Sequence, residues 1–162
     1  MSLADRLQAD MTTAMRDGDA LKRDTLRMVL AAAHNAQVAA RRPLTDDELV
    51  GVLSREAKTR RESIEAFTKV GRAELADKER AEADIIAAYL PAALTEDELR
   101  AMVTEAIAAT GASSARDLGK VMGRLSPTIK GRADGKEVSG MVAQELAKVD
   151  LAAHAHGGVG GD

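Results

Sequence analysis

The sequence has no cysteine and no tryptophan, and it holds one tyrosine and one phenylalanine among 162 residues. Without cysteine there is no disulfide, no thiolate nucleophile and no cysteine-ligated metal site. Aromatic and β-branched residues, which favour pleated sheets, are sparse, whereas alanine, the strongest helix former, is abundant. The composition therefore predicts an all-α fold whose core consists of leucine, isoleucine, valine, methionine and alanine.

Long apolar runs are also missing. No stretch approaches the roughly 20 apolar residues that span a bilayer, and the opening Met-Ser-Leu-Ala-Asp-Arg lacks the apolar centre of a signal peptide. We therefore expect a cytoplasmic protein that makes no contact with a membrane.

The net charge of −3 conceals two segments of opposite sign. Residues 74–105 contain nine acidic and three basic side chains, whereas residues 116–136 contain six basic and two acidic ones. The acidic net charge argues against a surface coated uniformly for nucleic acid, so any contact with nucleic acid must be local. The basic segment is its expected place.

Apolar residues at helical spacing predict four helices before Pro91, over about 3–17, 19–40, 46–70 and 73–88. Thr45 and Glu48 have the spacing of a capping box at the start of the third helix. Each expected helix ends at a glycine or proline signal, which sharpens its boundary.

Three shorter helices are expected after Pro91. Thr95 and Glu98 repeat the capping-box spacing and open the first of them. The second covers about 115–125, and Ser126-Pro127 is expected to end it because proline lacks an N–H. Asp134 is expected to cap the third, which includes Leu146.

The break at residues 91–95 predicts two helical subdomains. Residues 1–92 are expected to form a bundle of about four helices, and residues 93–150 a bundle of about three short helices. Residues 151–162 are rich in alanine, histidine and glycine and are expected to fray as a flexible tail.

The main candidate site is the glycine-bearing basic loop over 129–136. It places Lys130, Arg132 and Lys136 around Gly131 and Gly135, which permit positive φ and a close approach of the backbone. N–H groups at the start of the next helix would add partial positive charge for a phosphate. The functional interpretation is contact with RNA phosphates, and the alternative is an ordinary turn with solvated charges. No aromatic residue lies nearby to stack on a base, so recognition would rest on shape or backbone.

Three basic side chains form a second basic face on the third expected helix: Lys58, Arg60 and Arg61. Glutamates at i, i+4 spacing, such as Glu56 with Arg60, indicate a solvated, salt-bridged face. The alternative is a surface for RNA or a partner protein. Acidic side chains of the next helix, such as Glu79 and Glu82, are likewise expected on a solvated face.

The sequence offers no catalytic constellation. His34 lies within the second expected helix and is expected to be a boundary residue rather than a ligand, and His154 and His156 lie two apart without the fixed third ligand that a metal site needs. Neither a GxSxG elbow nor a cofactor fingerprint is present. We therefore expect no catalytic site, no metal and no cofactor.

Several segments resemble the YqeY family pattern. They are Leu21–Met28 (LKRDTLRM), Arg60–Phe67 (RRESIEAF), Gly71-Arg72 and Tyr89-Leu90-Pro91. The runs Asp117–Gly123 and Lys130–Lys136 resemble the domain that YqeY proteins share with the tail of the amidotransferase B subunit. The resemblance extends from about Leu3 to Val149.

This resemblance implies two α-helical subdomains and a link to tRNA. In the amidotransferase, which converts glutamate on misacylated tRNA to glutamine, the similar tail helps to hold the tRNA. The tRNA-contacting surface expected here, with the neighbouring Arg124 included, comprises Lys120, Arg124, Lys130, Gly131, Arg132, Asp134 and Lys136. A protein partner from aminoacylation or amidation is a further expectation.

The resemblance also brings the family label of a carbon–nitrogen ligase with glutamine as amide donor. The transamidation site of the amidotransferase lies in a separate, larger domain, to which nothing in this chain corresponds. The leading hypothesis is therefore a tRNA-binding accessory module without a catalytic site of its own. The alternatives are a helical protein-interaction module with no RNA role and an enzyme of the labelled class.

Overall fold

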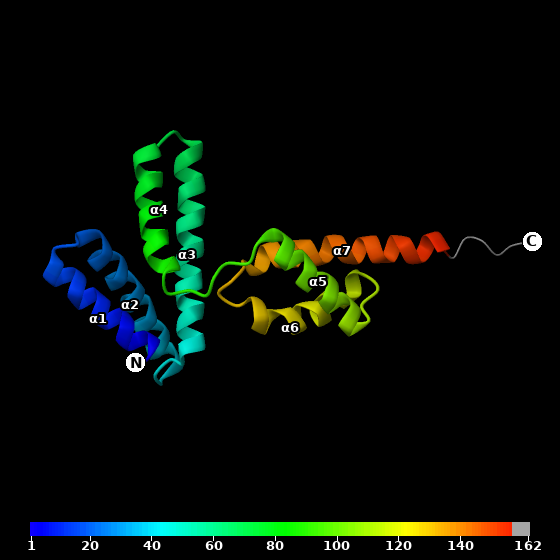
Figure 1. The fold of residues 1–162 in the computed structure, drawn as a ribbon, viewed down its shortest axis with the longest axis horizontal. Coiled ribbons are helices and arrows are strands. Elements are labelled where there is room, and N and C mark those ends of the chain that lie inside the picture. Colours follow the sequence, from blue (N-terminus) through cyan, green and yellow to red (C-terminus); the bar gives the residue numbers. More distant parts are fainter. Residues whose placement is uncertain (157–162) are drawn as a thin grey trace, which may run out of the picture. The chain divides into compact units, whose positions relative to one another are not determined.

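The computed structural model describes residues 1–156, and every regular element in that range is a helix (Figure 1). The all-α prediction is confirmed. The chain divides into two compact units, Met1–Pro91 and Ala92–Asp162, here called unit 1 and unit 2. No helix within the described range is long and apolar enough to cross a bilayer.

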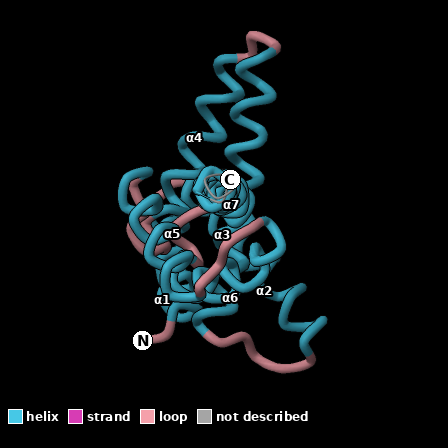
Figure 2. The backbone as a smooth tube through the Cα atoms, turned by 90° about the vertical axis from the view of Figure 1, so that its right-hand side faces the viewer, coloured by secondary structure: helices cyan, strands magenta, loops and turns pink. Residues whose placement is uncertain are grey.

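Unit 1 consists of α1 (Leu3–Asp17), α2 (Ala20–Ala40), α3 (Asp46–Lys69) and α4 (Ala73–Ala87). These bounds confirm the four helices that the apolar spacing predicts. Figure 2 shows α3 and α4 as an antiparallel hairpin closed by a short turn, in which Gly71 adopts a left-handed φ of 72° that a side chain would strain.

The capping signals of unit 1 are used differently from the expectation. The Thr45 hydroxyl accepts a hydrogen bond from the Glu48 N–H at 3.2 Å, as expected. The Glu48 carboxylate, however, accepts from the Thr45 hydroxyl and, at 2.9 Å, from the guanidinium of Arg42. The reciprocal capping box forms instead between Ser2 and Asp5 at the start of α1. Arg42 therefore binds the Glu48 carboxylate that was expected to accept from the backbone N–H of Thr45.

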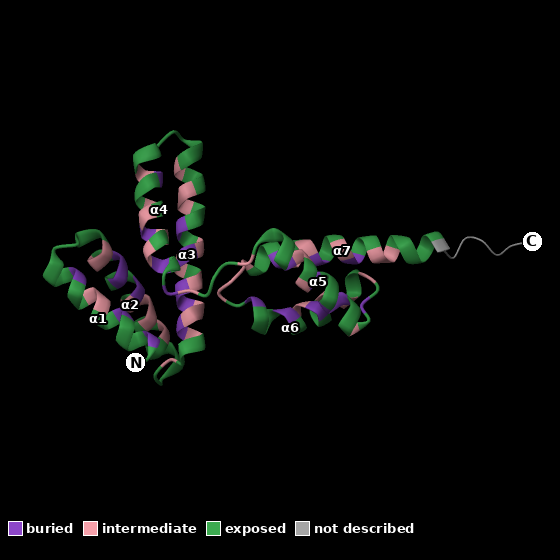
Figure 3. Cartoon of the chain, in the orientation of Figure 1, coloured by how far each residue is buried: buried purple, intermediate pink, exposed green. Residues whose placement is uncertain are grey.

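The core of unit 1 is aliphatic. Leu7, Leu26, Leu53 and Ile86, one from each helix, are fully buried, and Figure 3 shows the buried residues on the facing sides of the helices. Tyr89 closes this core after α4, and its hydroxyl donates to Asp10 of α1. Burial and this hydrogen bond both raise the pKa of Tyr89 above its ordinary value.

Unit 2 consists of α5 (Glu96–Thr110), a short 3₁₀ turn (Ala115–Asp117), α6 (Leu118–Ile129) and α7 (Gly135–His156). Its core is a separate aliphatic cluster. Val103, Val121, Val138, Val142 and Leu146 are fully buried in it. Because α5, α6 and α7 each contribute a buried stripe, the three helices hold the connecting loops in place.

Two expected helix ends in unit 2 are wrong. The helix expected to stop at Ser126-Pro127 continues through Pro127 to Ile129. Val121, Leu125 and Ile129 recur every four residues and are all buried, so the buried stripe continues past the exposed proline. The loss of one N–H donor is smaller than the gain from burying another large side chain.

The tail expected from residue 151 begins later. α7 continues to His156, and within that last part the imidazole of His154 contacts Asp150, which raises the pKa of His154. Residues 151–156 are therefore helical, and the rest of the expected tail, 157–162, lies outside the described residues.

The proline in α6 generates a stability prediction. Pro127→Ala restores a helical N–H without removing a buried contact, so we expect unit 2 to gain roughly 1–3 kcal/mol in unfolding free energy. Urea unfolding followed by far-UV circular dichroism measures the change. Thr128→Ala, at the next exposed position, is the matched control and should change stability by only a few tenths of a kcal/mol. A loss of stability in Pro127→Ala would show that the proline supports the helix end.

Candidate functional site

The basic loop of unit 2 is a short, internally bonded turn between α6 and α7. Gly131 adopts a left-handed φ of 74°, and the Arg132 N–H donates to the Ile129 carbonyl at 2.8 Å. Gly135 is already the first residue of α7. The Asp134 carboxylate accepts from the N–H of Lys136 at 3.2 Å, so Asp134 caps α7 as predicted.

Two of the expected RNA-contacting arginines are engaged within unit 2. The half-buried Arg132 donates from Nε to the Ala92 carbonyl at 3.1 Å, and its own carbonyl accepts from the Leu94 N–H at 2.9 Å. Arg132 thereby fastens the segment before α5 to the loop. Arg124 on α6 lies 3.6 Å from the carboxylate of Glu105 on α5.

The three lysines of the expected surface, in contrast to the two arginines, extend into solvent. Lys120, Lys130 and Lys136 are exposed, and none of them forms an ion pair with another described residue. Lys130 and Lys136 flank the loop, and Lys120 lies ten residues before Lys130, about 15 Å away along α6. We call these three residues the lysine surface.

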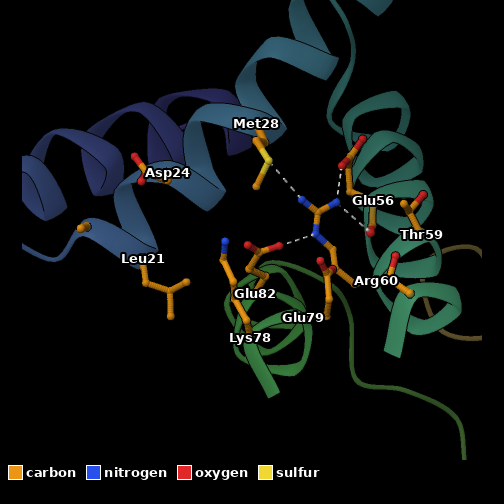
Figure 4. A pocket seen from close by; sticks show the side chains of 11 residues that line it. Leu21, Asp24, Met28, Glu56, Thr59, Arg60, Lys78, Glu79 and Glu82 are labelled. Atoms are coloured by element: carbon orange, nitrogen blue, oxygen red, sulfur yellow. Dashed lines mark hydrogen bonds and ion pairs between the residues drawn. The ribbon is translucent and has the colours of Figure 1, made fainter. Parts of the chain in front are cut away.

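Unit 1 contains a charged cluster where a solvated face was expected. Arg60 is 5% exposed and Glu82 is 6% exposed, so the expectation that Arg60 lies on an exposed basic face and Glu82 on a solvated face is wrong. The Arg60 guanidinium donates to Glu56 on its own helix, as the i, i+4 spacing predicts, and lies 3.4 Å from Glu82 on α4. Its remaining amino group contacts the sulfur of Met28 on α2 at 3.6 Å (Figure 4).

The hydrogen bonding of this buried cluster is incomplete. Nε of Arg60 is fully buried and has no hydrogen-bond partner, because the contact with Glu82 is long and poorly aligned. Glu82 accepts no hydrogen bond from any described residue. A buried carboxylate has room for several donors, so the cluster can accept a further hydrogen-bond donor.

A groove of about 660 Å³ opens onto this cluster within unit 1 (Figure 4). α2 contributes Leu21, Asp24 and Met28 to its walls, and α3 contributes Glu56 and Arg60. α4 contributes Lys78, Glu79 and Glu82. Four carboxylates and two cations line this acidic groove, which is large enough for a small organic molecule.

The groove brings together two segments that lie far apart in the sequence, Leu21–Met28 and Arg60–Phe67. A pattern in the sequence could have indicated that Arg60 and Glu82 are buried. Arg60 follows Leu53 and Ala57 on the buried stripe of α3, and Glu82 lies at i, i+4 spacing from the buried Ile86 on α4. Charged residues at positions of a helix that face the core are the signal that the sequence reasoning missed.

The remaining basic residues of the second face stay at the surface of α3. Arg61 is exposed and Lys58 is half-buried. His34 is exposed on α2. No group of three or more acidic or histidine side chains within residues 1–156 is placed to hold a metal ion.

Comparison with known proteins gives a consistent family. The family described as "Yqey-like protein" matches residues 4–146. The protein named "Altered inheritance of mitochondria protein 41, mitochondrial" from Pyrenophora tritici-repentis is 34% identical over 143 residues, which cover 87% of this chain and 78% of that protein. The protein of the same name from Eremothecium gossypii is 38% identical over 87 residues, 53% of this chain and 48% of its own.

The buried cluster generates a second stability prediction. Arg60→Ala leaves Glu82 as a buried charge without its cation, so we expect unit 1 to lose about 3–5 kcal/mol in unfolding free energy. Urea unfolding of the full chain measures it. Arg61→Ala, on the exposed face of the same helix, should change stability by less than about 0.5 kcal/mol. Equal effects of the two substitutions would contradict the assignment of Arg60 to the interior.

Proposed function

The chain belongs to the family of YqeY-like proteins, and on that premise we propose that it binds the sugar–phosphate backbone of tRNA through the lysine surface of unit 2. The observation that carries this proposal is that the arginines and the lysines of residues 120–136 are in different environments. The arginines are engaged in internal contacts, and Lys120, Lys130 and Lys136 are exposed without an ion pair in the described part of the chain.

The loop geometry supports contact with phosphates. The turn over 130–134 is held by the hydrogen bonds of Arg132 and Asp134, so the lysines at its two ends are carried by a rigid backbone. A rigid site loses less conformational entropy when it binds. The first N–H groups of α7 add partial positive charge beside Lys136. This loop contains no aromatic side chain that could stack on a base, so it would recognise the backbone and the shape of the RNA.

The proposed mechanism is positioning. Unit 2 holds the tRNA, and unit 1 docks a protein of aminoacylation or amidation, which supplies the chemistry. The proposal assigns no ligase activity to the chain alone. A cytoplasmic location stays a prediction, because the fungal relatives are named as mitochondrial proteins.

A protein-interaction module without an RNA role is the second candidate. Exposed apolar side chains on the first two helices, Met15, Leu21, Met28 and Val38, favour it. Partners captured from lysate before and after nuclease treatment separate the two candidates. Partners that are retained after nuclease treatment indicate protein contacts, and partners that are lost indicate RNA.

The RNA proposal predicts the salt dependence of binding. Replacement of Lys120, Lys130 and Lys136 by glutamine should weaken tRNA binding and reduce the slope of log K against log salt by roughly 2–3, because each lost phosphate contact removes about 0.7–0.9. Filter binding or fluorescence anisotropy over a salt series measures it.

The matched control is Lys148→Gln on α7, an exposed lysine of the same unit that pairs with Glu145. It should leave both affinity and slope unchanged. If Lys148→Gln and Lys130→Gln weaken binding equally, the lysine surface has no special role. If the triple variant binds as the original does, the proposal is rejected.

A further inference from the structure

We propose that α2 of unit 1 pairs with α2 of a second copy of this chain as an antiparallel, two-helix coiled coil. The surface involved is a row of six residues on the solvent side of α2, here called the α2 stripe. It comprises Leu21, Asp24, Met28, Ala31, Asn35 and Val38. The inference concerns unit 1 alone and does not depend on the RNA proposal for unit 2.

The α2 stripe has the spacing of a coiled-coil seam. Its residues follow one another at alternating intervals of three and four along almost the whole helix, so they share one face. All six are exposed. Among them Leu21, Met28 and Val38 are large apolar side chains, and they are 38%, 42% and 62% exposed. The helix buries a different face in unit 1, which includes Leu26 and Val29. The stripe is therefore a second apolar face that unit 1 leaves uncovered.

The stripe is complementary to its own reverse. Its intervals are three, four, three, four and three, and this series reads the same from either end. A two-fold axis at the middle of the stripe therefore brings each residue opposite another member of the stripe, as in an isologous interface. The resulting pairs are Leu21 with Val38 of the second copy, Met28 with Ala31, and Asp24 with Asn35. Apolar residues thus meet apolar residues, and the two polar residues meet each other.

Asp24 favours the antiparallel direction over the parallel one. Parallel helices would place the two Asp24 carboxylates opposite each other, where like charges repel. In the antiparallel pair the amide of Asn35 of the second copy can donate to Asp24. The Asp24 carboxylate is paired with Arg23 at 2.8 Å, but a carboxylate accepts several donors. The Asn35 side chain forms no hydrogen bond with any described residue, so its amide is available.

This match identifies a second copy as the occupant. A helix that covers the stripe has to present apolar side chains and one amide in a fixed order, and α2 itself presents them in that order when it is reversed. Six residues from each copy bury a small area, at the low end of specific interfaces. We therefore expect a reversible dimer with a dissociation constant on the order of micromolar.

Sedimentation velocity of the full chain, at concentrations from well below to well above the micromolar range, measures the dimer. Ala31→Glu brings a carboxylate from each copy close to the two-fold axis, so we expect the dissociation constant to rise at least about tenfold. Ala31 is exposed, so the fold is retained, which a thermal melt checks. The matched control is Gln37→Glu, an exposed position of α2 outside the stripe, which should change the constant less than about twofold.

The direction of the helices is tested by cross-linking, which is clean because the chain has no cysteine. Leu21→Cys and Val38→Cys are prepared as separate variants, and diamide supplies mild oxidation. We expect a covalent dimer when the two variants are mixed, and none from either variant alone. A disulfide requires Cα atoms within about 7 Å, and only the antiparallel pair brings residue 21 next to residue 38.

Three results would overturn the inference. A chain that stays monomeric at every concentration rejects a second copy as the occupant and leaves the stripe to a different protein. A dimer that Ala31→Glu weakens no more than Gln37→Glu has its interface elsewhere. Covalent dimers from either cysteine variant alone, without any in the mixture beyond those, would show parallel helices.

Discussion

The burial of one guanidinium is the constraint on which unit 1 depends. Removing Arg60 and Glu82 from water costs several kcal/mol for each ion, and their contact with each other and with the half-buried Glu56 offsets this cost. Glu56 lies on the same helix as Arg60, whereas Glu82 comes from α4, so this contact fixes the register of the helical hairpin. An aliphatic core around Leu53 and Ile86 tolerates small shifts more readily than a charge pair does.

Arginine and lysine side chains have different roles in unit 2. Arg132 presents several donors in a planar fork, and it bridges the loop to the segment before α5 through the carbonyl of Ala92. Lysine is a compact, strongly hydrated charge on a flexible stem, and Lys130 and Lys136 stay in solvent. The basic residues of this stretch are thus divided into those that hold the loop and those that are exposed on it.

The sequence by itself determined the all-α class, the ends of most helices and the family, because these depend on local spacing, caps and motifs. Ser2, Thr45 and Thr95 act within one turn of the chain, and so does the i, i+4 pair of Glu56 with Arg60. Only the tertiary structure decided that Glu82 is buried against Arg60, that Arg132 binds Ala92, and that α6 continues past Pro127. Each of these outcomes depends on contact with a residue from another element. A local pattern can place a charge such as Arg60 or Glu82 on the side of its helix that faces the core, but it cannot identify the partner that the charge contacts there.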